Sequence, residues 1–144
     1  MNAAEQATNV ELASKIAATV NLIKSELPDI RADLKPWTND RDTRELIDPE
    51  SIDLGFHFPG QSRRWQCQSI LLQIRFYEDP IDNLHRAIGV EAAGFDYRGK
   101  RWQFSTIEQW QFVGVACPQP EMAEQFKEFC AQILLLFNGS GSST

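Results

Sequence analysis

Hydrophobic residues near the start of the chain recur every three or four positions, which is the spacing of one helix face. The stripe consists of Leu12, Ile16, Val20, Ile23 and Leu27. Thr8 and Glu11 have the three-residue spacing of a capping box, and Pro28 ends the pattern because its ring and missing N–H interrupt a helical ladder. We therefore expect an amphipathic helix before Pro28, with a stripe that packs on the rest of the fold or against another subunit.

Residues 28–50 are polar and contain Pro36 and Pro49, which are unfavourable inside regular elements. Good helix formers follow Asp42, so a short helix over Asp42–Ile47 is one alternative, and an irregular connecting arm is the other. In either case hydrophobic side chains should anchor the segment on the core. The expected anchors are Ile30, Leu34 and Trp37.

From residue 51 to residue 115 the hydrophobic spacing changes to two, which is typical of β-strands. Turn residues divide this stretch at residues 59–62 and 96–100, where Gly99 suits a positive φ. We expect an antiparallel meander of about five strands. They cover residues 52–58, 64–77, 84–95, 101–107 and 110–115.

Two of these strands carry specific predictions about burial. In residues 64–77 the hydrophobic parity changes after Cys67, so either both faces are partly buried or a β-bulge near Gln68-Ser69 switches the phase. In residues 84–95 four hydrophobic residues share one parity and should lie on one face. They are Leu84, Ile88, Val90 and Ala92.

A second helix is expected near the end of the chain. Pro118-Gln119-Pro120 leads into it, Glu121 and Glu124 suit its positive end, and Asn138-Gly139 supplies its stop. Residues 140–144 form a Gly/Ser tail that we expect to be disordered. The buried helix face should comprise Met122, Phe126, Phe129, Ile133 and Phe137, widened by Cys130, Leu134 and Leu136.

The order of helix, meander and helix predicts an α+β fold. Each helix carries one apolar stripe and the sheet has at least one apolar face, so a two-layer sandwich buries all of them together. We expect a single domain over residues 1–139, with the long C-terminal helix at the centre of the helical layer.

The bulk composition narrows the class of protein. The 144 residues suffice for one ordinary domain, and 42% of them are hydrophobic, as in folded globular proteins. The formal net charge of −6 disfavours broad binding to a phosphate backbone. Residues 61–103 reverse the sign, with seven bases against five acids, so a small basic patch remains open.

Cysteine usage and hydropathy bear on the compartment. Cys67, Cys117 and Cys130 are odd in number and widely spaced, which favours buried thiols in a reducing environment over a disulfide framework. The first residues lack the pattern of a signal peptide, and no apolar run approaches the about 20 residues that span a bilayer. We expect a cytoplasmic protein that does not contact the membrane.

Candidate chemistry is sparse. His57 lies on the polar parity of its strand with Asp53, and Glu91 occupies a comparable position further on. These three residues, with Glu108 as a further carboxylate and Trp102 nearby, could line a pocket between the sheet and the C-terminal helix. We find no spacing typical of a catalytic triad, a metal site or a phosphate-binding loop, and we expect no cofactor and no metal.

A repeated phrase is the most conspicuous motif. Arg64-Trp65-Gln66 returns as Arg101-Trp102-Gln103, and Trp110-Gln111 forms a third Trp-Gln pair. One interpretation is a core cluster with arginines stacked on the indoles. A second is an interface for a protein partner, since Trp and Arg dominate binding hot spots. A third is a face for single-stranded nucleic acid, which the acidic net charge makes unlikely. The candidate face comprises Arg64, Trp65, Arg101, Trp102 and Trp110.

The Trp/Gln-rich strands and the Pro-Gln-Pro-Glu entry at Pro118–Glu121 resemble those of small cyanobacterial proteins of unknown function. The resemblance covers roughly residues 8–138. It implies a cytoplasmic protein of a photosynthetic bacterium, and it brings no activity and no site residue with it.

The leading hypothesis is a non-enzymatic binding, assembly or regulatory module that acts through a protein partner or a homodimer. The alternative is a small-molecule-binding protein or enzyme with a pocket between the sheet and the C-terminal helix. The exposure of the tryptophans and the position of any cavity distinguish the two.

Overall fold

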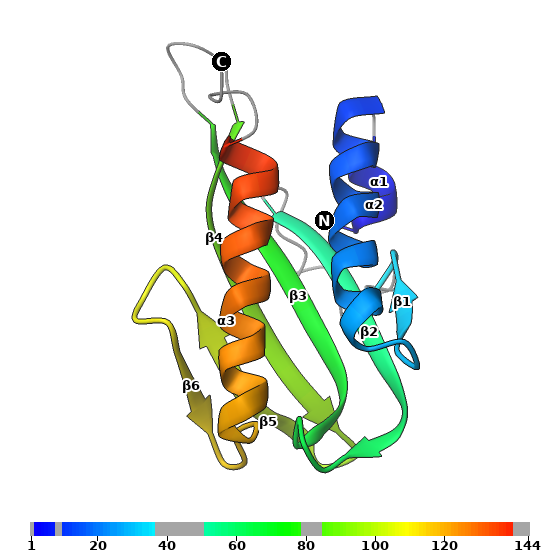
Figure 1. Ribbon diagram of the computed structural model, residues 1–144, viewed down its shortest axis with the longest axis vertical. Coiled ribbons are helices and arrows are strands. Elements are labelled where there is room, and N and C mark those ends of the chain that lie inside the picture. Colours follow the sequence, from blue (N-terminus) through cyan, green and yellow to red (C-terminus); the bar gives the residue numbers. More distant parts are fainter. Residues whose placement is uncertain (1, 8–9, 37–50, 79–84, 140–144) are drawn as a thin grey trace, which may run out of the picture.

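A computed structural model shows two long helices on one face of an antiparallel sheet, which confirms the predicted α+β sandwich (Figure 1). It describes residues 2–7, 10–36, 51–78 and 85–139. In chain order the elements are α1 (Ala3–Gln6), α2 (Val10–Glu26), β1 (Arg31–Asp33), β2 (Ser51–Ser62), β3 (Cys67–Glu78), β4 (His85–Asp96), β5 (Gly99–Ser105), β6 (Gln111–Gly114), α3 (Pro120–Leu134) and the π-helical turn η2 (Leu135–Gly139).

The sheet has six strands, in the order β1-β2-β3-β4-β5-β6, and every neighbouring pair is antiparallel. The meander is therefore as predicted, with one strand more than expected. The additional strand is β1, which is only three residues long and lies in the segment that we interpreted as a connecting arm. A strand of that length is too short to display a period of two.

Several sequence predictions for the arm and the termini have different outcomes. Ile30 is buried as expected, whereas the side chain of Leu34 is exposed. The remaining predictions lie outside the described residues. They concern Thr8 of the capping box, Trp37, the helix over Asp42–Ile47, Leu84 and the tail 140–144.

The turn predicted at residues 59–62 is wrong, because β2 continues through Pro59 and Gly60 to Ser62. The register explains why proline is tolerated there. His57 pairs with Ser69 and Ser62 pairs with Cys67, so residues 58–61 of β2 stand opposite Gln68 alone. The irregularity lies opposite Gln68, where the parity change in residues 64–77 suggested a β-bulge, but the extra residues are in β2 and not in β3. A bulge does not require the missing proline N–H.

A second bulge corrects the expectation for Ile88. Arg75 pairs with Gly89 and Phe76 pairs with Ala87, so Ile88 is the extra residue in β4. Its side chain is exposed, while Val90 and Ala92 on the same predicted face are buried.

The helices bury the predicted stripes against the sheet. In α2, Ile16 and Ile23 are buried and the rest of the stripe is partly buried. In α3 and η2 all five residues of the predicted face are buried. Asn138 fastens η2 to β4, since its amide oxygen accepts from the N–H of Ala87 (2.9 Å) and its amide nitrogen donates to the carbonyl of Ala87 (2.6 Å). The hydrophobic stripe of α2 therefore packs against the core of the same domain.

The cysteines provide a direct test of this burial. Cys67 and Cys130 are buried and Cys117 is exposed. Loss of solvation raises the pKa of Cys67 to about 12 and also raises the pKa of Cys130, so both thiols stay protonated and unreactive. Ellman's reagent at pH 8 should react rapidly with one thiol per native chain and with three in denaturant. Rapid reaction of two or three thiols in the native protein would contradict the packing.

Candidate functional site

The first two tryptophans of the repeated phrase lie in the core. Trp65 and Trp102 are fully buried on the sheet face that the helices cover, and each ring packs edge-on against Phe126. The indole N–H of Trp102 donates to the carbonyl of Trp65 at 2.8 Å, so the two copies of the phrase are bonded to each other. Neither indole is available to a protein or a nucleic acid in this structure. Of the alternatives left open by the sequence, core packing describes these two residues.

The large indole of Trp102 fits because its cross-strand partner is Gly94. A Cβ at Gly94 would lie 2.3 Å from Cε2 of the indole, well inside contact distance. Gly94 therefore indicates that Trp102 is buried against it, but this inference requires the register of β4 and β5.

The two arginines of the candidate face, Arg64 and Arg101, have different partners. Arg64 is exposed, with Nη2 3.5 Å from the carboxylate of Glu121, which is a weak surface pair. Arg101 has Nε 3.5 Å from Oδ2 of Asp96, and Arg98 donates to the same oxygen at 2.8 Å. The hydrogen bond from Arg98, with a smaller contribution from the charge of Arg101, lowers the pKa of Asp96. The five predicted residues do not form one surface.

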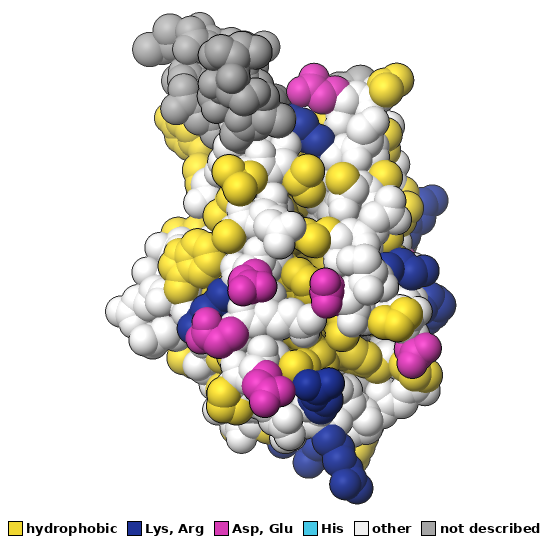
Figure 2. Space-filling view, viewed as in Figure 1, with side chains coloured by type: hydrophobic (Ala, Val, Ile, Leu, Met, Phe, Trp, Pro, Cys, Tyr) yellow, Lys and Arg dark blue, Asp and Glu magenta, His cyan; other side chains and the backbone are white. Residues whose placement is uncertain are grey.

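Trp110 is the predicted residue that remains accessible. It is 36% exposed, adopts a positive φ of 55°, and packs edge-on against Phe104 with the ring centroids 6.3 Å apart. Val113 and Val115 follow it on β6 and just beyond, and both are exposed. We call Trp110, Val113 and Val115 the β6 surface. Figure 2 shows hydrophobic side chains at the molecular surface where Figure 1 places the β5–β6 turn.

The predicted pocket between sheet and C-terminal helix is wrong. That interface is packed, with a cavity of only about 10 Å³ lined by apolar side chains. Strand alternation sends Ile52, Leu54 and Phe56 toward the helices, so Asp53 and His57 face the other way. The opposite sheet face, which we call the open face, therefore carries the predicted polar residues.

On the open face the three predicted pocket residues have separate partners. His57 has Nδ1 2.7 Å from Oγ of Ser69 and Nε2 3.4 Å from Oδ2 of Asp33, which links three neighbouring strands. The carboxylate of Asp53 instead accepts from Ser51 (2.6 Å) and from the Gln73 amide (3.3 Å). Glu91 lies two strands away from Asp53, so the structure does not assemble one catalytic group from them.

A Ser-His-Asp order also occurs in hydrolases, where it is accompanied by donors for an oxyanion. Here Ser69 of β3 is the paired position of His57 in β2, Asp33 of β1 lies diagonally from His57 because it pairs with Gly55, and both imidazole nitrogens are engaged. The contacts fasten the short strand β1 to the sheet, which is a structural role.

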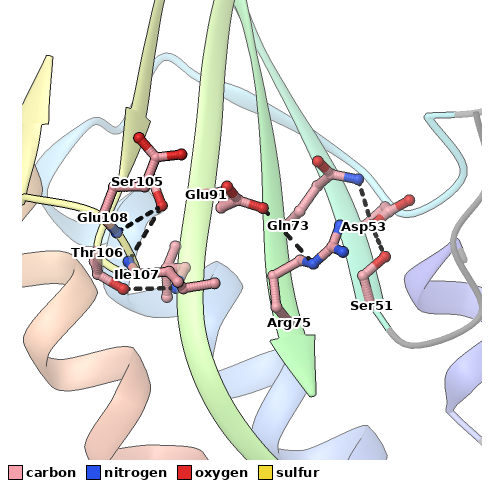
Figure 3. A network of polar contacts seen from close by, with 10 residues as sticks. Ser51, Asp53, Gln73, Arg75, Glu91, Ser105, Thr106, Ile107 and Glu108 are labelled. Carbon is pink, nitrogen blue, oxygen red and sulfur yellow. Dashed lines mark hydrogen bonds and ion pairs between the residues drawn. The ribbon is translucent and has the colours of Figure 1, made fainter. Parts of the chain in front are cut away.

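Glu91 belongs to a row of polar residues in register across the five strands β2 to β6. Figure 3 shows most of this row, with the side chains of Asp53, Gln73, Glu91 and Ser105 on the open face. Between β4, β5, β6 and the β5–β6 turn the face is hollowed by a cavity of about 200 Å³. We call it the polar hollow. The side chains that line it include Glu91, Ala93, Lys100, Gln103, Glu108, Gln111 and Val113.

The charged groups of the polar hollow differ in how they are paired. Glu91 has Oε1 3.6 Å from Nε of Arg75, and Lys100 donates to the side-chain oxygen of Gln103 at 3.1 Å. The backbone N–H of Glu108 is held by Oγ of Ser105, whereas its carboxylate has neither a hydrogen bond nor an ion pair within the described ranges. The sequence placed Glu108 with Asp53 and Glu91 among the pocket carboxylates, and the structure puts Glu91 and Glu108 in this hollow on the open face and not under the C-terminal helix.

Among the residues that the structure describes, no group of three or more His, Cys, Asp or Glu side chains is arranged to hold a metal ion. None of the described helices combines the length and apolar content that a bilayer crossing needs.

Comparison with known proteins gives a family and nothing finer. A family model described as a domain of unknown function matches residues 4–139, close to the extent that the resemblance suggested. This match does not address the cyanobacterial origin that the resemblance implied. No curated protein and no solved structure matches the chain.

Proposed function

The chain belongs to a family described as a domain of unknown function, and from its surface we propose that it is a non-enzymatic binding module that holds a protein partner at the β6 edge. The observation that carries the proposal is the contrast between the two edges of the sheet. Within the described residues, β1 and β6 are the edge strands. The residues of β1 are Arg-Ala-Asp, whereas those of β6 are Gln-Phe-Val-Gly and carry no charge.

An edge strand exposes backbone N–H and C=O groups that another chain can pair with, and charged side chains are a common protection against such pairing. Arg31 and Asp33 supply that protection at β1. At β6 the exposed side chains are instead the uncharged Gln111 and the hydrophobic Val113, and the exposed Trp110 and Val115 flank the strand. An unprotected edge flanked by an exposed tryptophan is the arrangement used when a peptide adds a strand to a sheet.

The other candidate functions have less support. The α2 stripe that motivated a homodimer packs inside the domain, so a second copy is now one outcome of the test. The predicted face for single-stranded nucleic acid would need the rings of Trp65 and Trp102 to be exposed, and both are buried. Small-molecule sites are mostly apolar and occupy about 300–1,000 Å³, whereas the polar hollow is smaller and polar.

The proposal is tested by affinity capture from an extract of the source organism, in which the wild type is compared with a variant that carries a charge on the β6 edge. Val113→Lys adds the missing protection at a side chain that is 50% exposed. The matched control is Ile88→Lys, since Ile88 is also a β-branched strand residue and is 54% exposed. Both variants should keep the urea midpoint of the wild type. We expect wild type and Ile88→Lys to capture the same protein and Val113→Lys to lose at least tenfold in affinity.

Two results would contradict this proposal. One is equal capture by all three proteins, which would place the contact elsewhere. The other is no specific capture by the wild type together with a sedimentation mass above the 16.4 kDa of one chain, which would make a second copy the partner.

A further inference from the structure

We propose that the partner segment at β6 is an extended strand that places a lysine or arginine side chain in the polar hollow. This inference rests on the proposed function and adds the chemistry of the partner. It draws on the position of the hollow beside β6, the pairing state of its charges and the apolar wall that adjoins it.

The position of the hollow matches the side chains of an added strand. Gln111 and Val113 of β6 line it and lie on the open face, in register with Ser105 and Gln103 of β5. A strand paired with the outer edge of β6 would lie about 4.8 Å away, and every second side chain would lie on the same face as Gln111 and Val113. Directly opposed and diagonal cross-strand positions are within reach of long side chains. A long side chain from the added strand therefore extends over β6 toward the hollow.

The charges of the hollow favour a cation. Two carboxylates, Glu91 and Glu108, line it against one ammonium group, which Gln103 already engages. Glu91 is shared with Arg75, so the carboxylate of Glu108 is the acceptor left without a partner among the described residues. An anionic side chain would meet the Lys100 ammonium group but also the carboxylate of Glu108, whereas a lysine or arginine would gain a charge-assisted hydrogen bond to Glu108. The net charge of −6 favours approach of a basic segment.

The remaining lining suits the rest of such a side chain. Ala93 and Val113 give the hollow an apolar wall, and the methylene groups of lysine and arginine cover apolar surface of this kind while the charged end bonds elsewhere. The amide oxygen of Gln111 is a further acceptor at the β6 side.

Panning a phage-displayed library of random linear dodecapeptides on the full chain provides the probe. We expect the enriched peptides to alternate β-forming residues and to carry a lysine or arginine at one fixed position. Glu108→Gln should raise the Kd of a synthetic copy about tenfold, the loss typical of one charge-assisted hydrogen bond. Glu128→Gln, an exposed carboxylate on α3, is the matched control and should leave the Kd unchanged.

A second peptide completes a double-mutant cycle. Replacing its basic residue with methionine should cost the same factor on the wild type and nothing further on Glu108→Gln. Enriched peptides without a basic residue, or a Kd that ignores Glu108→Gln while Val113→Lys abolishes binding, would overturn the inference and leave the β6 edge as the binding site. Failure to enrich any peptide, or binding that Val113→Lys does not weaken, would count against both proposals.

Discussion

Replacing Gly94 with alanine is expected to lower the free energy of unfolding by about 3 kcal/mol, the upper range for overpacking a core. The added Cβ would lie 2.3 Å from Cε2 and 2.4 Å from Nε1 of Trp102. The indole cannot move away easily, because it is fully buried and its N–H donates to the carbonyl of Trp65. Urea unfolding followed by tryptophan fluorescence measures the change.

Gly60→Ala is the matched control for this substitution. Gly60 also lies in a strand, and a Cβ there would meet no heavy atom within 4 Å. Alanine usually stabilises a strand relative to glycine, so this variant should be neutral or slightly more stable. Equal stability of Gly94→Ala and the wild type would show that Trp102 does not lie against β4.

Replacing Phe126 with alanine is expected to cost about 4 kcal/mol, within the range for removing a buried aromatic ring. The ring of Phe126 is the centre of the aromatic core, and the cavity left by its removal would be lined by rings that are fixed by other contacts. The ring centroids in contact with it are those of Phe104 (5.4 Å), Phe112 (5.7 Å), Trp65 (6.0 Å), Trp102 (6.3 Å) and Phe129 (6.5 Å).

The comparison for Phe126→Ala is Tyr97→Ala, which removes an aromatic ring that is 87% exposed at the β4–β5 turn. The stability of that variant should stay within about 0.5 kcal/mol of the wild type. Loss of less than 1 kcal/mol in Phe126→Ala would contradict the packing of α3 on the aromatic core of the sheet.

The two helices could be predicted from the sequence because their stripes are long and regular. The stripe from Met122 to Phe137 covers four turns and has no competing period, and the structure buries all of it. Strand β1 could not be predicted, since three residues carry too little pattern. The bulge at Ile88 was missed because an extra residue in a ladder is a property of the pairing and leaves no mark on one strand alone.

The candidate site could be predicted only in part, for a related reason. The alternation placed Asp53 and His57 on one face, but it could not say which face the helices cover. Trp65 and Trp102 were weighed as surface or core residues, and the decision depended on Gly94 opposite Trp102, which is a matter of register. The polar hollow combines residues of β4, β5, β6 and a turn, so its composition follows from pairing that the sequence does not state.

The uneven protection of the sheet edges connects the fold with the proposed function. Two buried tryptophans hold the sheet to α3, while the third, Trp110, remains at the surface beside an edge strand without charges. The copies of the repeated Trp-Gln phrase therefore differ in burial, and only Trp110 is accessible to the proposed partner.

Site-specific photo-crosslinking tests most directly whether the β6 edge binds a protein. Benzoylphenylalanine at position 113 replaces a side chain that is 50% exposed on β6, and the same residue at position 135 replaces Leu135, which is 65% exposed on η2. Irradiation of cells of the source organism should give one discrete adduct from position 113 and none from position 135. The absence of an adduct at position 113, or the same adduct from both positions, would contradict a binding role for β6.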